Sequence, residues 1–517
     1  MRLVSGTLMC RFVGVIREVV LAYAFGAGRA MDQFWVAFTL PNLIREVLGE
    51  KVMDSAFLPA FKKLSEESSG ARAWRLASSI ATTLLVLFLP VLAIGLLFAP
   101  QAIAIIAPGF TPIEVEQSVV LTRVMFGFIL FIGLAAISGA ILQAQERFGL
   151  YGLAPGILNL VMVICILTGH QWLGLGAAAL GMVIGAAAQY VTQAIGVGPA
   201  GNDQIKWRFT PQIRRTDPEF RRVIKLSGPL VAESLATRIV IIVERMIASL
   251  LPAGSIAALN YSFRLAQLPF ALAALGLSRV VMPILIEQRA SYRNDEFLET
   301  FRLGIRLLFL LIIPCSVLLI TLRYPLIRII YERGHFTPAD TQNVAWALVF
   351  QSCGLLGMGA VSMISRVFYA VQETAIPVAV NIFRSVANIV LTYLLAFTFL
   401  AHGGIALASS ISFSFAGLAL YQLLKRRLLK QGTYLSLGHI RWILLGYCLA
   451  GCVMAGIVTL GNFWLESVWS GTGIVVDGLR IVILSTVGLA VFIGSCVAID
   501  PGILRQISRR RQTTAVE

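Results

Sequence analysis

The two apolar segments at the start of the chain, residues 4–26 and 32–58, carry ionisable side chains far from their ends. Each segment is long enough to cross a bilayer as a helix, which needs about 20 mainly apolar residues. A charge at the centre of such a helix costs roughly 2.5–3.5 kcal/mol on insertion scales, and a simple anchor would avoid that cost. The charged residues therefore predict a protein-lined, water-accessible cavity and are candidates for function: Arg11, Arg17, Glu18, Asp32, Arg45, Glu46 and Glu50.

Helical spacing places some of these side chains on common faces. Asn42, Arg45, Glu46 and Gly49 fall on one face of the second segment. Arg11 and Glu18 are seven residues apart and so share a face of the first segment. An alternative stays open for Arg11, Glu18 and Glu50, and also for Arg17 and Arg45, in which these residues lie near helix ends and extend to the membrane surface.

The composition extends this interpretation to the whole chain. Of its 517 residues, 58% are hydrophobic and only 13% are charged, whereas soluble domains have about 25% charged residues. The sequence therefore predicts an all-α polytopic membrane protein with about fourteen transmembrane helices. The expected spans are residues 4–26, 32–58, 76–106, 118–145, 150–168, 172–196, 222–250, 256–286, 302–321, 341–369, 376–400, 403–424, 441–461 and 477–499.

The distribution of Lys and Arg predicts the orientation. With fourteen spans, the basic links 60–75, 197–222 and 425–441 and the tail after residue 500 lie on one side. Basic loops favour the cytoplasmic side, so both termini are predicted to be cytoplasmic. The main exception is the link 322–340, with its three arginines. The net charge of +16 then reflects this bias, and its partner is the anionic membrane surface, not nucleic acid.

An internal repeat at an offset of 224–230 residues divides the chain. Ala27-Gly28 matches Ala253-Gly254, and the triplet at 110–112 matches that at 336–338. Six spans separate the copies, so they are predicted to form two lobes related by a pseudo-two-fold axis along the membrane normal. The expected divisions are residues 1–200, residues 201–430, and residues 431–517, which hold two extra helices and the basic tail. This arrangement suggests an alternating-access transporter.

The repeat also pairs two glycine-containing turns, at residues 26–28 and 252–254. Glycine adopts positive φ at little cost. We therefore predict that Gly26, Gly28 and Gly254 form tight hinge turns at matching places in the two lobes.

The second lobe carries fewer charges. Its strongest feature is Arg264, in the sequence NYSFRLAQLPF. Arg238, Glu244 and Arg245 are expected to pair with one another in the seventh span.

The eleventh span has polar residues at helical spacing, for which helix–helix hydrogen bonding is the favoured interpretation and an ion site the alternative. They are Asn381, Ser385, Asn388 and Thr392.

Motifs of catalysis and cofactor binding are missing from the sequence. The seven cysteines lie in apolar segments without a CxxC pair, and no HExxH, nucleophile elbow or phosphate-binding loop occurs. We therefore expect a non-enzyme with no metal and no cofactor.

Several longer stretches resemble the MurJ/MviN family, the bacterial lipid II flippases of the multidrug/oligosaccharidyl-lipid/polysaccharide exporter superfamily. The similar stretches lie between residue 1 and about residue 430; they are RFVGVIRE, FGAGRAMDQFWVAFTLPNLIRE, AFLPAF, APGF, ILQAQERFGLYGLAPGILN, GHFTPAD and VQETAIPV. The resemblance implies two six-helix lobes around a cationic cavity. It also implies transport of the lipid-linked peptidoglycan precursor to the outer leaflet. It places family functional positions at Arg11, Arg17, Asp32, Asn42, Arg45 and Arg264.

The sequence departs from the family pattern in a few places. Phe263 and Gln267 stand where acidic residues often occur, and Glu46 stands where some members have a second basic residue. The eleventh span has no carboxylate, so a sodium site known in some members is not expected here.

The chemistry of lipid II agrees with these residues. Its pyrophosphate needs compensating charge, and arginine offers planar, bidentate donors. We expect Arg17 and Arg45 of the first lobe and Arg264 of the second to converge on it. Asp32 is expected to hold one of these arginines when the cavity is empty. Proteins of cell-wall synthesis or division are further expected partners.

Two other function classes stay open. One is a drug exporter, or a flippase for another polyprenyl-linked glycan. A cavity for cationic drugs would favour net negative charge, which the arginines oppose. The other is a membrane glycosyltransferase, which would need a catalytic carboxylate in an outer loop; Glu332 and Asp340 are the candidates in the link 322–340.

Overall fold

The computed structural model describes residues 2–67, 70–199, 209–271, 284–288, 291, 293–370, 373–430, 438, 440–469 and 473–502. The regular elements within these ranges are all helices. The basic tail from residue 503 onward and part of the link 197–222 lie outside them. The prediction of an all-α polytopic membrane protein is confirmed.

Nine of the described helices are long and apolar enough to cross a membrane. The bent pair α14 (Pro338–Cys353) and α15 (Leu355–Ala370), with an angle of 41° between its halves, raises this number to ten if it is one span. The remaining predicted spans correspond to α1 (Arg2–Phe25), α2 (Arg29–Ile44), α9 (Pro218–Ser249) and α10 (Ser255–Phe270). These four helices are short or carry several charged side chains. Among them, α1 and α2 correspond to the two charged apolar segments at residues 4–26 and 32–58.

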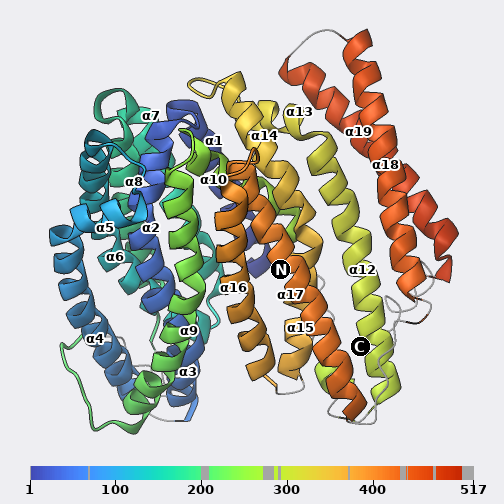
Figure 1. Cartoon of the computed structure of the whole chain (residues 1–517). Coiled ribbons are helices and arrows are strands. Elements are labelled where there is room, and N and C mark those ends of the chain that lie inside the picture. Colours follow the sequence, from blue (N-terminus) through green and yellow to red (C-terminus); the bar gives the residue numbers. More distant parts are fainter. Residues whose placement is uncertain are drawn as a thin grey trace. The chain divides into compact units, whose positions relative to one another are not determined.

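The first compact unit comprises residues 1–257 and 333–337. In it α6 packs against α2, α4 and α8, and α7 packs against α1 and α8 (Figure 1). The rings of Phe57, Phe61 and Trp74 pack against one another at tilted angles in its core, with centroids 5.6 and 5.3 Å apart. Besides α1, α2 and α9, its elements are η1 (Arg45–Glu50), η2 (Met53–Phe57), α3 (Leu58–Glu67), α4 (Gly70–Leu97), α5 (Ala99–Ile106), α6 (Pro112–Ala144), α7 (Phe148–Leu173) and α8 (Leu175–Gly196).

The second compact unit comprises residues 258–332 and 338–517. Within it α12 packs against α15 and α18, and α16 packs against α17. Helices α18 and α19 form a hairpin, and α19 also contacts α13. Besides most of α10 and the pair α14–α15, its elements are α12 (Asn294–Thr321), α13 (Arg323–Ile330), α16 (Ala375–Ala396), α17 (His402–Lys430), α18 (Ile440–Val468) and α19 (Ile474–Ile499).

The boundary between the compact units differs from the boundary of the repeat. The units divide after Ala257, so α9 belongs to the first. The repeat would place α9 at the start of the second lobe. The two divisions differ because the repeat is defined by similar residues at a constant offset in the sequence, whereas a compact unit is defined by contacts between residues. The lobe limits at residues 200 and 430 therefore stay a prediction.

Two buried carboxylates connect the hairpin of α18 and α19 to neighbouring helices of the second unit. Asp477, only 3% exposed, lies 2.9 Å from Arg328 Nη2 of α13 and 3.5 Å from Arg480 Nη1. Asp500 follows α19; its Oδ2 lies 3.4 Å from Arg306 Nη1 of α12 and accepts a hydrogen bond from the Tyr447 hydroxyl at 3.2 Å. These contacts tie both ends of α19 to neighbouring helices. They also provide a structural role for Arg328, one of the arginines in the exceptional basic link.

We expect Asp477→Ala to destabilise the second unit strongly. The substitution leaves the Arg328 and Arg480 guanidinium groups without their carboxylate, and breaking a buried ion pair costs about 3–5 kcal/mol. Thermal unfolding of the purified protein in detergent should show a clearly lower midpoint. Glu466→Ala, on the exposed surface of α18, is the matched control and should leave the midpoint unchanged. Equal midpoints for both variants would contradict this role of Asp477.

Candidate functional site

The Arg17 cluster, defined as Arg17, Glu18 and Asn159, joins α1 to α7. Arg17 Nη1 donates a hydrogen bond to Asn159 Oδ1 at 2.9 Å, and Arg17 Nη2 lies 2.5 Å from Glu18 Oε1. Helix α1 approaches α7 closely through Gly14 and Gly156, where added Cβ atoms would lie 3.8 Å from the Asn159 side chain and 3.0 Å from Cys10 Sγ. Small residues at such a crossing let polar side chains meet between helices. Their packing therefore brings Arg17 to its partner.

Burial separates two residues that the seven-residue spacing placed together. Glu18 is 3% exposed, while Arg11 is exposed. The alternative that Glu18 extends to the membrane surface is therefore wrong. Arg17 contacts the Glu18 carboxylate although the two are adjacent in sequence. Spacing alone misses this contact, because the long arginine side chain can bend back along the helix.

The Glu46 cluster, defined as Asn42, Arg45, Glu46 and Arg238, joins the end of α2 to α9. Arg45 donates from Nε and Nη2 to Asn42 Oδ1, at 3.1 and 3.0 Å. Asn42 Nδ2 and Arg45 Nη2 approach Glu46 Oε1 at 3.2 and 3.4 Å, and Arg238 Nη1 lies 2.7 Å from Glu46 Oε2. The contacts confirm that Asn42, Arg45 and Glu46 share a face. The carboxylate that contacts Arg238 at 2.7 Å comes from η1, and pairing among Arg238, Glu244 and Arg245 within α9 stays a prediction.

The backbone changes its winding at this cluster. Helix α2 contains Pro41 and passes into the π-helical turns η1 and η2 from Arg45 onward. Proline removes a backbone donor from a helix, and short π-helical turns occur often at functional sites. Arg45 and Glu46 therefore project from a locally widened turn. The side chain of Glu50 lies outside the described residues.

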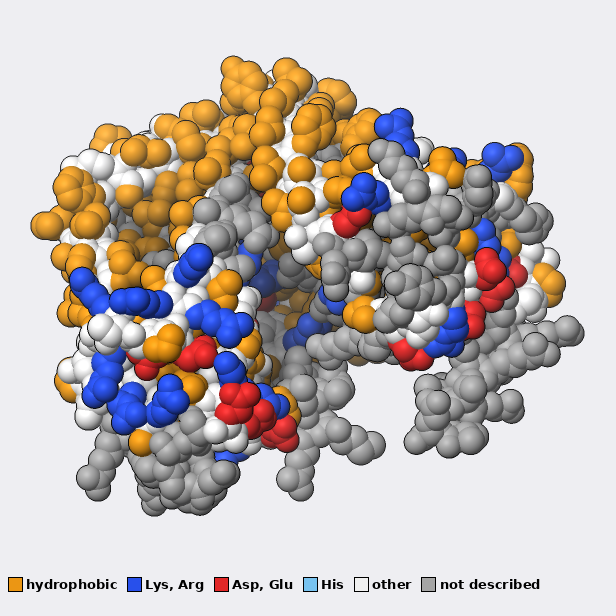
Figure 2. All heavy atoms as spheres, turned by 90° about the horizontal axis from the view of Figure 1, so that it is seen from below, with side chains coloured by type: hydrophobic (Ala, Val, Ile, Leu, Met, Phe, Trp, Pro, Cys, Tyr) orange, Lys and Arg blue, Asp and Glu red, His pale blue; other side chains and the backbone are white. Residues whose placement is uncertain are grey.

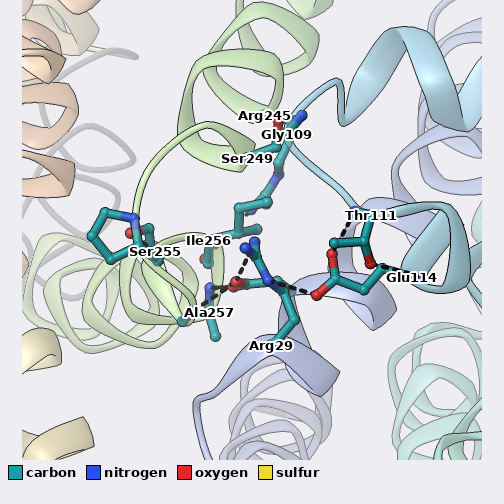
Figure 3. Close-up of polar contacts among 12 residues, drawn as sticks. Arg29, Gly109, Thr111, Glu114, Arg245, Ser249, Ser255, Ile256 and Ala257 are labelled. Atoms are coloured by element: carbon teal, nitrogen blue, oxygen red, sulfur yellow. Dashed lines mark hydrogen bonds and ion pairs between the residues drawn. The ribbon is translucent and has the colours of Figure 1, made fainter.

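The turn cluster, defined as Arg29, Asp32, Glu114 and residues 254–257, joins α2 and α6 to the start of α10. Asp32 is 1% exposed; its Oδ2 accepts from Gly254 N at 2.7 Å and its Oδ1 from Ala257 N at 2.8 Å. Arg29 lies 3.8 Å from Asp32 and 3.1 Å from Glu114, as Figure 3 shows for Arg29 and Glu114. A carboxylate at free N–H groups stabilises a helix N-terminus. Asp32 thus caps α10 from a helix more than 200 residues earlier in the chain.

Further contacts hold this turn cluster in place. Arg245 Nη1 of α9 donates to Ile256 O at 3.5 Å, and Gly109 N donates to Ser249 Oγ at 3.2 Å (Figure 3). Thr111 and Glu114 form a reciprocal capping box at the start of α6, which fixes the carboxylate that Arg29 meets. The expectation that Asp32 holds Arg17 or Arg45 is not matched, because its partners here are backbone N–H groups and Arg29.

Only two of the three predicted hinge glycines use a positive φ. Gly26 has φ 69° and Gly254 has φ 86°, whereas Gly28 is extended with φ −85° and ψ −162°. A Cβ atom at Gly254 would lie 2.5 Å from Ala27 O, while one at Gly28 would meet no atom within 4 Å. A positive φ at Gly28 is therefore excluded, and the hinge role of the three glycines stays a prediction. The two repeat-related turns instead pack against each other, with Gly254 at the contact.

We expect Gly254→Ala to impair the protein and Gly28→Ala to be tolerated. Alanine at residue 254 is disfavoured at positive φ and collides with Ala27 O, while residue 28 has both space and an ordinary backbone conformation. Protein level in membranes and growth of a strain that depends on this protein measure the two effects. The same loss in both variants would show that the turn contact does not control the outcome.

Arg264 lies on α10 in the second unit and is exposed. Arg17 and Arg45 lie in the first unit, where Arg17 contacts Asn159 of α7 and Arg45 contacts Asn42 and Glu46. The convergence of the three arginines on one anion therefore stays a prediction.

The polar residues of the eleventh span contact a neighbouring helix. Ser385, Asn388 and Thr392 are buried in α16, and Ser409 Oγ of α17 donates to Asn388 Oδ1 at 3.4 Å. This contact supports helix–helix hydrogen bonding. Within the described ranges, no group of three His, Cys, Asp or Glu side chains could hold a metal ion.

Three residues that complete these clusters were not predicted from the sequence: Arg29 and Glu114 of the turn cluster, and Asn159, which binds Arg17. Arg238 was predicted to form ion pairs, but its contact with Glu46 was not. Asn159 lies in the family-like stretch ILQAQERFGLYGLAPGILN, and Arg29 lies within FGAGRAMDQ. These family-like stretches could have identified Asn159 and Arg29 as candidates. Their contact partners could not be predicted in this way, because they lie in distant parts of the chain.

Comparison with known proteins agrees with this architecture. The family model "Lipid II flippase MurJ" matches residues 21–484. A probable lipid II flippase MurJ of Vibrio cholerae is 29% identical over 499 residues, which cover 94% of this chain and 93% of the relative. The lipid II flippase MurJ of Burkholderia cenocepacia is 27% identical, covering 88% of each chain.

Solved structures give the same result. A lipid II flippase MurJ in an inward closed conformation has a TM-score of 0.80 and 25% identity, covering 97% of this chain and 99% of its own. An inward-facing multidrug transporter of the MATE family shares the fold, with a TM-score of 0.68 at 15% identity over 83% of this chain and 98% of its own. The chain is a multi-pass membrane protein, and it belongs to the MurJ family of lipid II flippases.

Proposed function

We propose that this protein moves lipid II from the cytoplasmic to the outer leaflet of the bacterial inner membrane by alternating access. The observation that carries the proposal is the family match together with two arginines held by polar partners in the charged helices. Arg17 is oriented by Asn159, and Arg45 by Asn42. A guanidinium group that is already oriented can bind a phosphate with two parallel hydrogen bonds. The pyrophosphate of lipid II is such a ligand.

Translocation needs no covalent step. A flippase must shield the polar head group while the polyprenyl tail stays in lipid, so binding and conformational change are sufficient. This agrees with the relatives, which are named flippases. We therefore propose a transporter without catalytic residues.

Depletion of this protein tests the function directly. We expect depleted cells to accumulate lipid II in the cytoplasmic leaflet, and reconstituted protein to expose lipid II on the opposite side of liposomes. Unchanged lipid II distribution after depletion, with normal export from the purified protein of another substrate, would support the drug-exporter class.

The proposed orientation places both termini in the cytoplasm. Exposed basic side chains lie on α3, the start of α4, residues 209–217 and the start of α9. Figure 2 looks onto this face, where Lys and Arg side chains gather. Basic loops favour the cytoplasmic side.

Thiol labelling of intact cells measures this orientation. In a background without the seven native cysteines, Thr216→Cys should resist a membrane-impermeant reagent, and Glu116→Cys should react. Both positions are exposed, and Glu116 is preferable to Glu114, which contacts Arg29. Reaction at residue 216 from outside would reverse the orientation.

A further inference from the structure

We propose that Glu46 is an internal counter-anion for Arg45 and Arg238, which the phosphate groups of the substrate displace when they bind. This inference rests on the proposed function. It adds the residue with which the pyrophosphate competes, and it adds Arg238 as a further cationic residue of the site.

The geometry of the carboxylate supports the exchange. Its Oε1 lies 3.4 Å from Arg45 Nη2 of η1, and its Oε2 lies 2.7 Å from Arg238 Nη1 of α9. One carboxylate thus lies between guanidinium groups from two elements. Carboxylate and phosphate both accept paired hydrogen bonds from arginine. The two Glu46 oxygens therefore occupy positions that phosphate oxygens could take.

Charge explains why the free protein needs such a group. Arg45 and Arg238 carry like charges, and Glu46 compensates for one of them in the absence of substrate. Asn42 forms hydrogen bonds with both Arg45 and Glu46 and so fixes the position of one side chain relative to the other. Without Glu46 the two positive charges would lack compensation until a phosphate binds, while Asn42 still orients Arg45.

Exposure explains why the contact can be exchanged. The side chains of Arg45, Glu46 and Arg238 are 24%, 21% and 37% exposed. Partly exposed ion pairs contribute little net free energy, so a ligand can replace them. The Glu46 Oε2 atom that faces Arg238 is itself shielded from solvent, so the exchange also requires the partly exposed Arg238 side chain to move. A pyrophosphate carries more negative charge than a carboxylate and can displace it. Because Glu46 stays tethered beside the arginines, it can later compete with the bound phosphate and favour release.

The first test compares Glu46→Gln with the parent protein, using the full chain in lipid nanodiscs and purified lipid II as the probe. The amide keeps the size of the side chain but removes the competing charge. We expect the Kd for lipid II to fall about tenfold, and the transport rate in liposomes to fall at least threefold because release is slower. Glu66→Gln, an exposed change of the same kind on α3, should behave like the parent.

Two results of this test would overturn the inference. One is parental affinity and transport in Glu46→Gln, and the other is weaker binding, which would make Glu46 a positioning residue only. If the parent itself does not bind lipid II, the proposed function fails as well. Binding by the parent with no change in Glu46→Gln rejects the counter-anion alone.

A second variant keeps the inference testable if Glu46→Gln does not fold. Arg238→Gln removes one guanidinium group, so we expect lipid II to bind at least tenfold more weakly. Arg222→Gln removes the same charge from an exposed position on the same helix and should bind like the parent. Parental binding by Arg238→Gln would overturn the assignment of Arg238. If both Gln variants fold, the double variant should show a smaller gain from Glu46→Gln, because the two side chains are coupled.

Discussion

Arg17→Ala, Arg45→Ala and Arg264→Ala are each expected to abolish growth of a strain that lacks its own lipid II flippase. Arg17 and Arg45 are oriented by amide side chains in the structure, so their guanidinium groups are ready to bind an anion. Removing either should weaken lipid II binding at least tenfold, since hydrogen bonds between ionised groups are about twice as strong as neutral ones. Arg264 is included because the family-like sequence around it predicts the same role.

Lysine at the same positions should restore only part of the activity. Lysine keeps the positive charge but loses the planar fork that binds two phosphate oxygens. At position 17 it would also lose the geometry that reaches Asn159 and Glu18 together. Partial growth with lysine and none with alanine would separate charge from geometry.

Binding of lipid II to purified variants decides this prediction. Arg72→Ala, an exposed change at the start of α4, is the control for loss of one positive charge. If all three alanine variants are folded and bind lipid II like the parent, these arginines do not form the pyrophosphate site.

Asp32→Asn is expected to impair transport strongly while lipid II still binds. Asp32 accepts hydrogen bonds from Gly254 N and Ala257 N with its two oxygens. Asparagine keeps one acceptor and places an NH2 group where the other was. One buried N–H then loses its partner, which costs about 1–3 kcal/mol. The contact between α2 and the start of α10 becomes less stable. We therefore expect the substitution to change the conformational cycle and to leave the arginine clusters intact.

Two assays on the same purified protein measure this separation. We expect the Kd for lipid II to stay within about threefold of the parent and transport in liposomes to fall at least tenfold. Glu116→Gln removes a carboxylate from an exposed position on α6 and is the control. Parallel loss of binding and transport in Asp32→Asn would place Asp32 in substrate binding instead.

Hydropathy and local spacing were sufficient to predict the helices and the contacts among Asn42, Arg45 and Glu46. The apolar segments predicted an all-helical membrane protein because a bilayer requires every backbone polar group to be satisfied within the segment. The Asn42, Arg45 and Glu46 contacts followed from spacing, because neighbours three and four residues apart on a helix lie on one face. Arg17 and Arg45 were identified as candidates because a charge inside a membrane helix costs free energy that a simple anchor would avoid.

Tertiary packing decided the partners. Arg238 meets Glu46, and Asp32 meets Gly254 and Ala257, across about 190 and 220 residues of chain. Glu18 is buried and Arg11 is exposed, although their separation of seven residues places both on one face of α1. Gly28 is extended and Gly254 has positive φ, although the repeat aligns them. Periodicity describes one helix at a time, whereas burial, capping and ion pairing depend on which helices pack together, and that choice is made by the whole fold.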